Sequence, residues 1–301
     1  MYKNAEKKNI KRTIAPALMA VFFLSGEVRA EVLSVDPGDV IALPTGTSLI
    51  ALYHQNSKGN RLYAGGDKVS DDTDLKASVS LLRLVRFIDV GGLTVATQAI
   101  LPYGKVELDN SSGNQQSVSN SGFGDPIIGA TTWLVSDPTS RTWIGVPIYL
   151  SLPVGDYGSD RGGINIGENR WKAIFQLGLA KGLSDRIFVE LIGEYAIYGD
   201  NDDYYGKTLK QDDAVSAMGH LTYKITASSS VSISYYHSWN GESEVDGFNR
   251  ADEQNNSRWL ATVSSWVSPD FNIQFQYGQD IQVENGLRKD GQFNIRLAKL
   301  F

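Results

Sequence analysis

Residues 187–198 read IFVELIGEYAIY, and this stretch sets the pattern for the chain. Its odd positions are mostly apolar or aromatic: Ile187, Val189, Leu191, Tyr195 and Ile197. Its even positions include Glu190 and Glu194. A period of two predicts a β-strand with one apolar face and one polar face.

The same alternation recurs along the chain, most clearly in 171–181, 215–225, 271–278 and 293–301. The twelve expected strands span residues 47–56, 79–89, 92–102, 123–135, 142–152, 170–182, 185–198, 213–226, 229–240, 257–268, 270–280 and 291–301. Short runs rich in Val, Ile, Tyr, Phe, Trp and Thr support this assignment.

The connections between these strands alternate strictly between short and long. Short turns follow the even-numbered strands, at 90–91, 136–141, 183–184, 227–228 and 269. Long polar connections follow the odd-numbered strands, at 57–78, 103–122, 153–169, 199–212, 241–256 and 281–290. Outer-membrane barrels have tight periplasmic turns, longer extracellular loops and an even strand count. The sequence therefore predicts an all-β fold in which residues 47–301 form a transmembrane antiparallel up-and-down β-barrel of about twelve strands.

Two soluble architectures also contain many short strands. A β-sandwich does not require every second loop to be long, and a lipocalin-like barrel has fewer strands and an apolar interior. Aromatic residues favour the membrane barrel, because such barrels carry aromatic girdles at both interfaces. One expected girdle lies near the short turns and comprises Trp143, Phe188, Tyr223, Trp266 and Phe271. The other lies near the long loops and comprises Tyr53, Trp171, Trp239, Trp259 and Tyr277.

Residues 1–30 have the organisation of a secretory signal peptide. KKNIKR at 7–12 is followed by an apolar stretch and by a small-x-small end at Val28 and Ala30, which predicts cleavage before Glu31. The apolar stretch is shorter than a spanning helix needs. Residues 31–46, with Pro37 and Pro44, then form either a periplasmic tail or a short plug entering the lumen.

Composition excludes several classes of function. The chain contains no cysteine and three histidines, so neither a thiolate site nor a His-rich metal site is expected. Without residues 1–30 it has 22 basic and 32 acidic side chains, a net charge of −10. An acidic surface disfavours a nucleic-acid partner. We expect no cofactor and no metal, and an exported protein of the Gram-negative outer membrane.

A twelve-stranded barrel encloses a lumen wide enough for a small solute, and its inward side chains decide what passes. The lumen-facing candidates are Arg83, Lys172, Glu190, Glu194, His220, Lys224, Arg258, Gln274, Gln276 and Arg296. Their mixed charges predict ion pairs inside the lumen, with a role either in selectivity or in stability alone. In SLLRLVRFID, Arg83 and Arg86 fall on opposite faces, which predicts a bulge or an arginine at the interface.

The C-terminus ends at Phe301, with apolar residues at alternate positions behind it. This pattern resembles the assembly signal that the barrel insertion machinery reads, although Lys299 stands where an aromatic or apolar residue is usual. The barrel assembly machinery is therefore an expected partner, alongside outer-membrane lipid and lipopolysaccharide.

Five strings match one family in order: LPTGTSLIALYHQ at 43–55, SGFGDPIIGATTWLVSDP at 121–138, LPVGDYGSDRGGINIGENRW at 152–171, TLKQDD at 208–213 and QVENGLR at 282–288. Together they resemble the phenol meta-pathway (MetA) degradation family. Its members are secreted and resemble outer-membrane transporters, often found with the catabolism of aromatic compounds. The resemblance implies uptake of small hydrophobic or aromatic molecules.

Two other functions fit a barrel of this size. Outer-membrane phospholipases use a serine, a histidine and an asparagine on the outer face, and His237 lies on the odd face of its strand. Ser230 and Ser232 have the opposite parity, and no G-x-S-x-G motif occurs. We therefore expect no enzyme activity. The remaining alternative is a structural or adhesive barrel that transports nothing.

Overall fold

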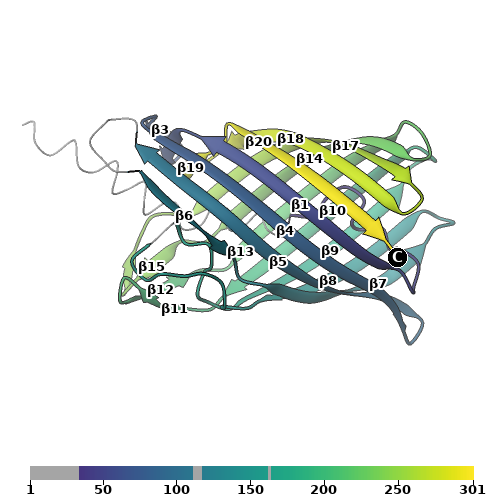
Figure 1. The fold of residues 1–301 in the computed structure, drawn as a ribbon, viewed down its shortest axis with the longest axis horizontal. Helices are drawn as coiled ribbons and strands as arrows, with labels where there is room; N and C mark the ends of the chain where they lie inside the picture. Colours follow the sequence, from purple (N-terminus) through teal and green to yellow (C-terminus); the bar gives the residue numbers. More distant parts are fainter. Residues whose placement is uncertain (1–33, 111–116, 162–163) are drawn as a thin grey trace, which may run out of the picture.

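The computed structural model describes residues 34–110, 117–161 and 164–301, and twelve long strands in it form one closed antiparallel barrel (Figure 1). These strands are β1 (Ser48–Gly59), β4 (Thr73–Val90), β5 (Leu93–Asn110), β7 (Ile127–Asp137), β8 (Thr142–Ser151), β9 (Lys172–Gly182), β10 (Ile187–Tyr198), β13 (Ala214–Lys224), β14 (Ser229–Asn240), β17 (Gln254–Ser268), β18 (Phe271–Gln282) and β20 (Gly291–Leu300). Each pairs with its neighbours along the chain, and β1 pairs with β20 to close the cylinder. The predicted fold is confirmed.

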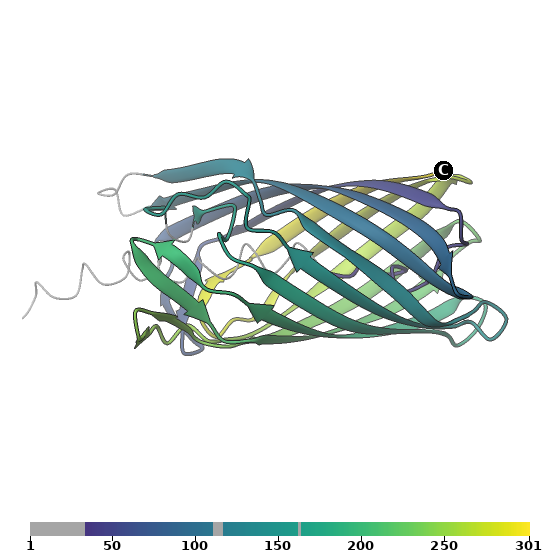
Figure 2. The ribbon, with the colours of Figure 1, turned by 90° about the horizontal axis from the view of Figure 1, so that it is seen from below.

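Short turns and the C-terminus lie at one end of the cylinder, and the long connections lie at the other (Figures 1 and 2). Ser48 and Phe301 hydrogen-bond each other's backbone in both directions, so the last residue extends the closing ladder. Within the described residues no helix is long and apolar enough to cross a membrane.

Each barrel strand turns its apolar face outward. In β14, Val231, Ile233 and Tyr235 are exposed, whereas Ser232 and Ser234 between them are buried. This inverts the usual inside and outside of a soluble protein, and it follows from lipid on the outside of the cylinder.

Eight further strands lie within the stretches that the sequence predicts to be polar connections. They are β2 (Arg61–Ala64), β3 (Asp67–Ser70), β6 (Val118–Phe123), β11 (Asn201–Tyr204), β12 (Lys207–Gln211), β15 (Ser243–Val245), β16 (Phe248–Asn249) and β19 (Gly286–Arg288). Most form two small sheets, β19-β2-β3 and β11-β12-β15-β16, from loops far apart in the chain. Strands of two to six residues carry too little periodicity to be predicted from the sequence. Pairing with distant loops stabilises them, and the local pattern does not record that pairing.

The aromatic residues depart from the predicted girdles at four positions. Tyr53 and Trp266 line the lumen, and Trp143 and Phe188 are buried in a core cluster inside it. Phe188 occupies an even position of β10, the face that points inward. In contrast, Trp171, Trp239 and Tyr277 are exposed near the long loops and Tyr223 near the turns, as a girdle requires.

Arg83 and Arg86 lie on opposite faces of β4 without a bulge, because the β4–β5 register runs unbroken through both. Arg83 points into the lumen. Arg86 is exposed at the turn end, where its Nη1 donates to Gly46 O at 2.6 Å and to Ser48 Oγ at 2.8 Å. An arginine at the interface is therefore the correct interpretation.

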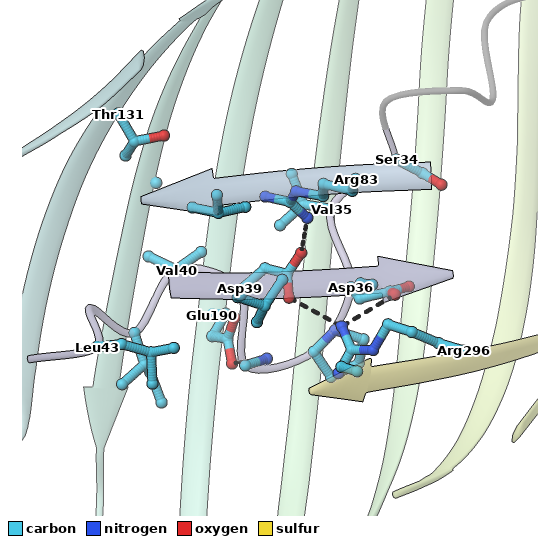
Figure 3. Close-up of a pocket in the computed structure, with 18 of the residues that line it drawn as sticks. Ser34, Val35, Asp36, Asp39, Val40, Leu43, Arg83, Thr131, Glu190 and Arg296 are labelled. Atoms are coloured by element: carbon cyan, nitrogen blue, oxygen red, sulfur yellow. Dashed lines mark hydrogen bonds and ion pairs between the residues drawn. The ribbon is translucent and has the colours of Figure 1, made fainter. Parts of the chain in front are cut away.

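Residues 34–43, here called the lumen segment, precede β1 and lie inside the cylinder (Figure 3). Val40 packs in the same core cluster as Phe87 and Trp133, and the Trp133 Nε1–H donates to Val40 O at 2.8 Å. The expected signal peptide, residues 1–30, lies outside the described residues.

Candidate functional site: the occupied lumen

The lumen segment presents two carboxylates on a tight turn. Residues 36–39 read DPGD, and Asp39 N donates to Asp36 O at 3.0 Å. Gly38 has a φ of +96°, which suits glycine at the third position of a type II turn after proline at the second. The local sequence therefore places Asp36 and Asp39 at the two ends of one turn.

Two arginines from the wall bind this turn. Arg83 of β4 places Nη1 2.6 Å from Asp39 Oδ2, and Arg296 of β20 places Nη1 3.0 Å from Asp39 Oδ1 and 3.3 Å from Asp36 Oδ2 (Figure 3). All four side chains are at most 20% exposed. Because β1 pairs with both β4 and β20, the two arginines approach from either side of one strand.

The two carboxyl groups differ in their surroundings. Burial raises the pKa of Asp36, and the negative charge of Asp39 raises it further. The positive charge of Arg296 lowers this pKa but does not outweigh the effect of burial. Burial acts on Asp39 in the same direction, but Arg83 and Arg296 together hold its pKa below the ordinary value. The surroundings therefore favour the ionised form more strongly for Asp39 than for Asp36.

Four other side chains of the wall also hold the lumen segment. Gln274 Nε2 and Gln276 Nε2 donate to Asp36 at 3.0 and 2.9 Å. Gly38 N donates to Glu190 Oε1 at 2.8 Å, and Tyr236 Oη donates to Val35 O at 3.2 Å. Contacts from β10, β14, β18 and β20 thus fix the segment around the circumference.

The ten predicted lumen residues all lie on the inward face. Besides His220, which interacts with the backbone of Val35, five of them contact the lumen segment. Those five are Arg83, Glu190, Gln274, Gln276 and Arg296. The other five contact the wall or a loop: Lys172 pairs with Glu168 at 2.8 Å, Glu194 accepts from Gln176 at 2.6 Å, His220 bonds Ser234 at 2.9 Å, Arg258 lies over Tyr236 and Lys224 lies over Phe188. The charged wall residues therefore bind the lumen segment, a loop or a side chain of a neighbouring strand.

Sequence reasoning missed the acidic partners. Asp36 and Asp39 lie outside the strands, and Glu168, which also binds Arg170, lies in a long connection. The signal that would have found the first two is DPGD itself, since a turn with two acids suits a lumen with two arginines. The ion pair between Asp39 and Arg296 could not be predicted, because the two residues lie far apart in the sequence.

A cavity of about 350 Å³ lies beside the lumen segment and has two unlike walls. One wall is apolar and aromatic, formed by Val85, Phe87, Trp133, Phe188 and Ile192. The other carries hydroxyl groups, from Thr222, Ser230, Ser232, Thr262 and Ser264, and charged side chains including Arg83, Glu190 and Lys224 line the same cavity. Ligand pockets typically combine an apolar surface with a few polar groups at about this volume.

The outer face contains the one histidine considered for hydrolysis. His237 Nε2 lies 2.7 Å from Asn255 Oδ1, and Nδ1 lies 3.0 Å from Tyr235 Oη. Both ring nitrogens are therefore engaged, and the ring also contacts Trp239 with 4.0 Å between centroids. Among the described residues no group of three or more His, Asp or Glu side chains is placed to hold a metal ion.

Residues 59–297 match the sequence family described as "Putative MetA-pathway of phenol degradation". The chain belongs to this family. The resemblance inferred from the five strings is therefore correct, and the family match extends from the end of β1 almost to the end of β20. Among curated proteins, none matches the chain.

Solved structures agree with this assignment. The COG4313 outer membrane channel from Pseudomonas putida F1 is 32% identical, covers 89% of this chain and 100% of its own, and superposes with a TM-score of 0.84. The transport unit of the autotransporter AIDA-I from Escherichia coli is 8% identical, covers 90% of this chain and 93% of its own, and has a TM-score of 0.54. The second likeness is one of fold alone. The protein is an outer-membrane β-barrel that resembles the outer-membrane channels of Gram-negative bacteria.

Proposed function

We propose that the protein takes up small hydrophobic or aromatic compounds across the outer membrane. The observation that carries the proposal is the cavity beside the lumen segment, whose lining combines apolar and aromatic side chains with hydroxyl groups. An apolar cavity of about 150 Å³ accommodates benzene in another protein, so about 350 Å³ is ample for one substituted ring.

The family description adds support, because it places relatives in the degradation of phenol. Phenol has an aromatic face and one hydrogen-bonding group, which suits the two walls of the cavity. The 32% identical relative is described as an outer membrane channel, which supports a role in transport rather than a purely structural role.

Growth tests the proposal most directly. A strain lacking the gene is compared with a complemented strain on aromatic carbon sources at limiting concentration. We expect slower growth of the deletion strain on at least one of them, and equal growth on a sugar as the control. Equal growth on every aromatic source would contradict aromatic uptake.

We further propose that the lumen segment is a plug, and that the inward residues around it tune what passes. The contacts of Asp36 and Asp39 with Arg83 and Arg296 support this role. Liposome swelling separates a channel from an inert barrel, because a barrel that passes no solute with or without its segment is structural.

We propose that the protein is not a hydrolase. His237 hydrogen-bonds a tyrosine and an asparagine, a set that lacks the serine of outer-membrane phospholipases. An assay with a phospholipid substrate in detergent tests this, and His237→Ala would abolish any hydrolysis that depended on this residue.

A further inference from the structure

Lys224 is a cation of the lumen wall that no carboxylate neutralises. It is the last residue of β13, its side chain lies on the inward face, and it lines the cavity beside the lumen segment at the turn end. Among the described residues Lys224 forms no ion pair. Arg83 and Arg296 differ from it, because both bind carboxylates of the turn at residues 36–39. The charge of Lys224 is therefore available to a molecule in the cavity.

Two acidic groups near this end of the lumen serve other partners. Glu190 lines the same cavity, but its Oε1 accepts from Gly38 N at 2.8 Å. Glu190 also pairs with a residue of β13 that lies four positions before Lys224, about 13 Å along the strand. Asp185, in the turn between β9 and β10, pairs with Arg141. Neither carboxylate therefore neutralises Lys224.

The charge that does act on Lys224 has the same sign. Arg141, in the turn between β7 and β8, repels its ammonium group. The side chain of Arg141 reaches the edge of the Phe188 ring, because a Cβ on Gly182 would lie 2.6 Å from Arg141 Cδ and 3.1 Å from Phe188 Cε1. Two basic side chains thus lie beside one ring, and an anion in the cavity would reduce their repulsion.

Aromatic surface lies against the ammonium group. Lys224 Nζ is 4.1 Å from the centre of the Phe188 ring. Phe188 belongs to the same core cluster as Phe87, Trp133 and Ile192, which also line the cavity. A cation–π contact stabilises an ammonium group but leaves its charge unneutralised. The cavity therefore presents a positive charge directly beside apolar surface.

Hydroxyl groups lie on the other side of Lys224. Ser230 of β14 is its register partner, and Ser264 of β17 is in turn the register partner of Ser230. All three side chains line the cavity. Ser264 Oγ accepts from Asn272 Nδ2 at 3.0 Å, whereas the Ser230 side chain makes no hydrogen bond among the described residues. A carboxylate here would accept hydrogen bonds from an ammonium group and from a hydroxyl group.

We propose that Lys224 binds the carboxylate of aromatic acids in the cavity, with the ring against the apolar wall, so that aromatic carboxylates are among the solutes of this channel. This inference rests on the proposed function and narrows it, because it adds an anionic group to the aromatic solute. A ring bonded directly to a carboxylate fits, since Lys224 Nζ contacts the aromatic surface itself. Lys224 faces the lumen, so lipid headgroups outside the barrel do not reach it.

Binding of benzoate to the purified protein in detergent tests the proposal. Equilibrium dialysis compares benzoate with benzyl alcohol, a neutral aromatic of similar size, and with acetate, an anion without a ring. We expect the wild-type chain to bind benzoate about tenfold more tightly than either, the ratio that a hydrogen bond to a charged group typically provides. Raising the salt concentration should weaken the binding of benzoate and leave that of benzyl alcohol unchanged.

Lys224→Met removes the charge and keeps an unbranched side chain. The affinity for benzoate should fall about tenfold, while the affinity for benzyl alcohol is retained. The matched control is Lys181→Met, which removes the same charge at the same end of the barrel. Lys181 Nζ donates to Ser140 O at 2.8 Å and to Thr142 Oγ1 at 2.7 Å, and Lys181 does not line the cavity. This control should bind benzoate like the wild-type chain.

Three results would overturn the proposal. Equal binding of benzoate and benzyl alcohol would mean that the cavity has no anion site. Equal loss of both in Lys224→Met would mean that the lysine only supports the cavity, and binding of acetate as tight as that of benzoate would mean that the site ignores the ring. Binding of benzyl alcohol to the wild-type chain would still leave the proposed function standing. No binding of any aromatic compound would contradict both.

The salt dependence needs no substitution, so it decides the case in which Lys224→Met does not fold. Benzoate binding that is insensitive to salt would overturn the proposal as well. Ser230→Ala adds a second variant at the same site, since it removes only a hydroxyl group. It should weaken the binding of benzoate by less than Lys224→Met and leave that of benzyl alcohol unchanged. An unchanged affinity for benzoate in both variants would overturn the assignment of the carboxylate to this place.

Discussion

At the scale of single residues, Arg296 has the widest reach in the lumen. It binds both carboxylates of the DPGD turn, whereas Arg83 binds only one of the two, that of Asp39. Removing one partner of a buried ion pair leaves the other charge buried and uncompensated. The lumen segment is therefore held by a small set of interactions that single substitutions can break.

Arg296→Met should loosen the lumen segment, because it removes the guanidinium group while keeping an unbranched side chain. We expect docking of the segment to weaken by about 3–5 kcal/mol, the usual cost of breaking a buried pair. Liposomes containing the variant should swell faster in a small sugar. Arg186→Met, at an exposed turn arginine, is the control and should behave like the wild-type chain.

Acid should release the segment only at low pH. The pKa of Asp39 is lowered in the docked state, so its contribution is complete at neutral pH and is lost as the pH falls through that lowered value. The pKa of Asp36 is raised, so its protonation favours the docked state and opposes release. Arg83 and Arg296 stay charged throughout.

Single-channel conductance checks this expectation. It should stay constant on acidification until the pH is below the ordinary aspartate value of 3.8, and then rise. Asp39→Asn should conduct already at neutral pH. A rise in the wild-type chain well above pH 3.8 would show that another group controls the segment.

At the scale of elements, the barrel closes without the lumen segment. All twelve long strands find both neighbours within 48–300, and β1 meets β20 directly. The segment makes contacts inside the lumen but does not pair with a strand of the barrel. Folding and occlusion are thus separable properties of different parts of the chain.

Deleting residues 34–43 should therefore leave a folded barrel with a wider path. We expect the purified variant to migrate on gels as a compact, heat-modifiable species like the wild-type chain. Its conductance should exceed that of Arg296→Met, because every contact of the segment is lost. Unchanged conductance would mean that the loops at the other end close the barrel by themselves.

At the scale of the whole molecule, hydrocarbon on the outside decides which substitutions are tolerated. Leu191 is 55% exposed in the interior of β10, and Leu183 is 65% exposed in a turn. In water, both positions would accept a charge at little cost. In a membrane, the cost of a charge depends on depth.

Leu191→Arg should destabilise the barrel by about 2–4 kcal/mol, whereas Leu183→Arg should cost about 0–1 kcal/mol. Unfolding by urea in lipid vesicles measures both. Equal effects of the two substitutions would contradict the assignment of the outer face to lipid.

The strands could be predicted because their pattern is local. Within the membrane each long strand separates lipid from lumen, so alternation is imposed residue by residue there, as in IFVELIGEYAIY. The short strands of the loops lack this signal. Likewise the girdle assignment was wrong for Phe188 and Trp143, because proximity to a turn says nothing of the face on which a ring lies.

The sequence by itself determined the barrel, its strand number, its two unlike ends and the family. Only the tertiary structure decided which charges meet, because Asp39, Arg83 and Arg296 lie on three separate segments that closure of β1 against β20 brings together.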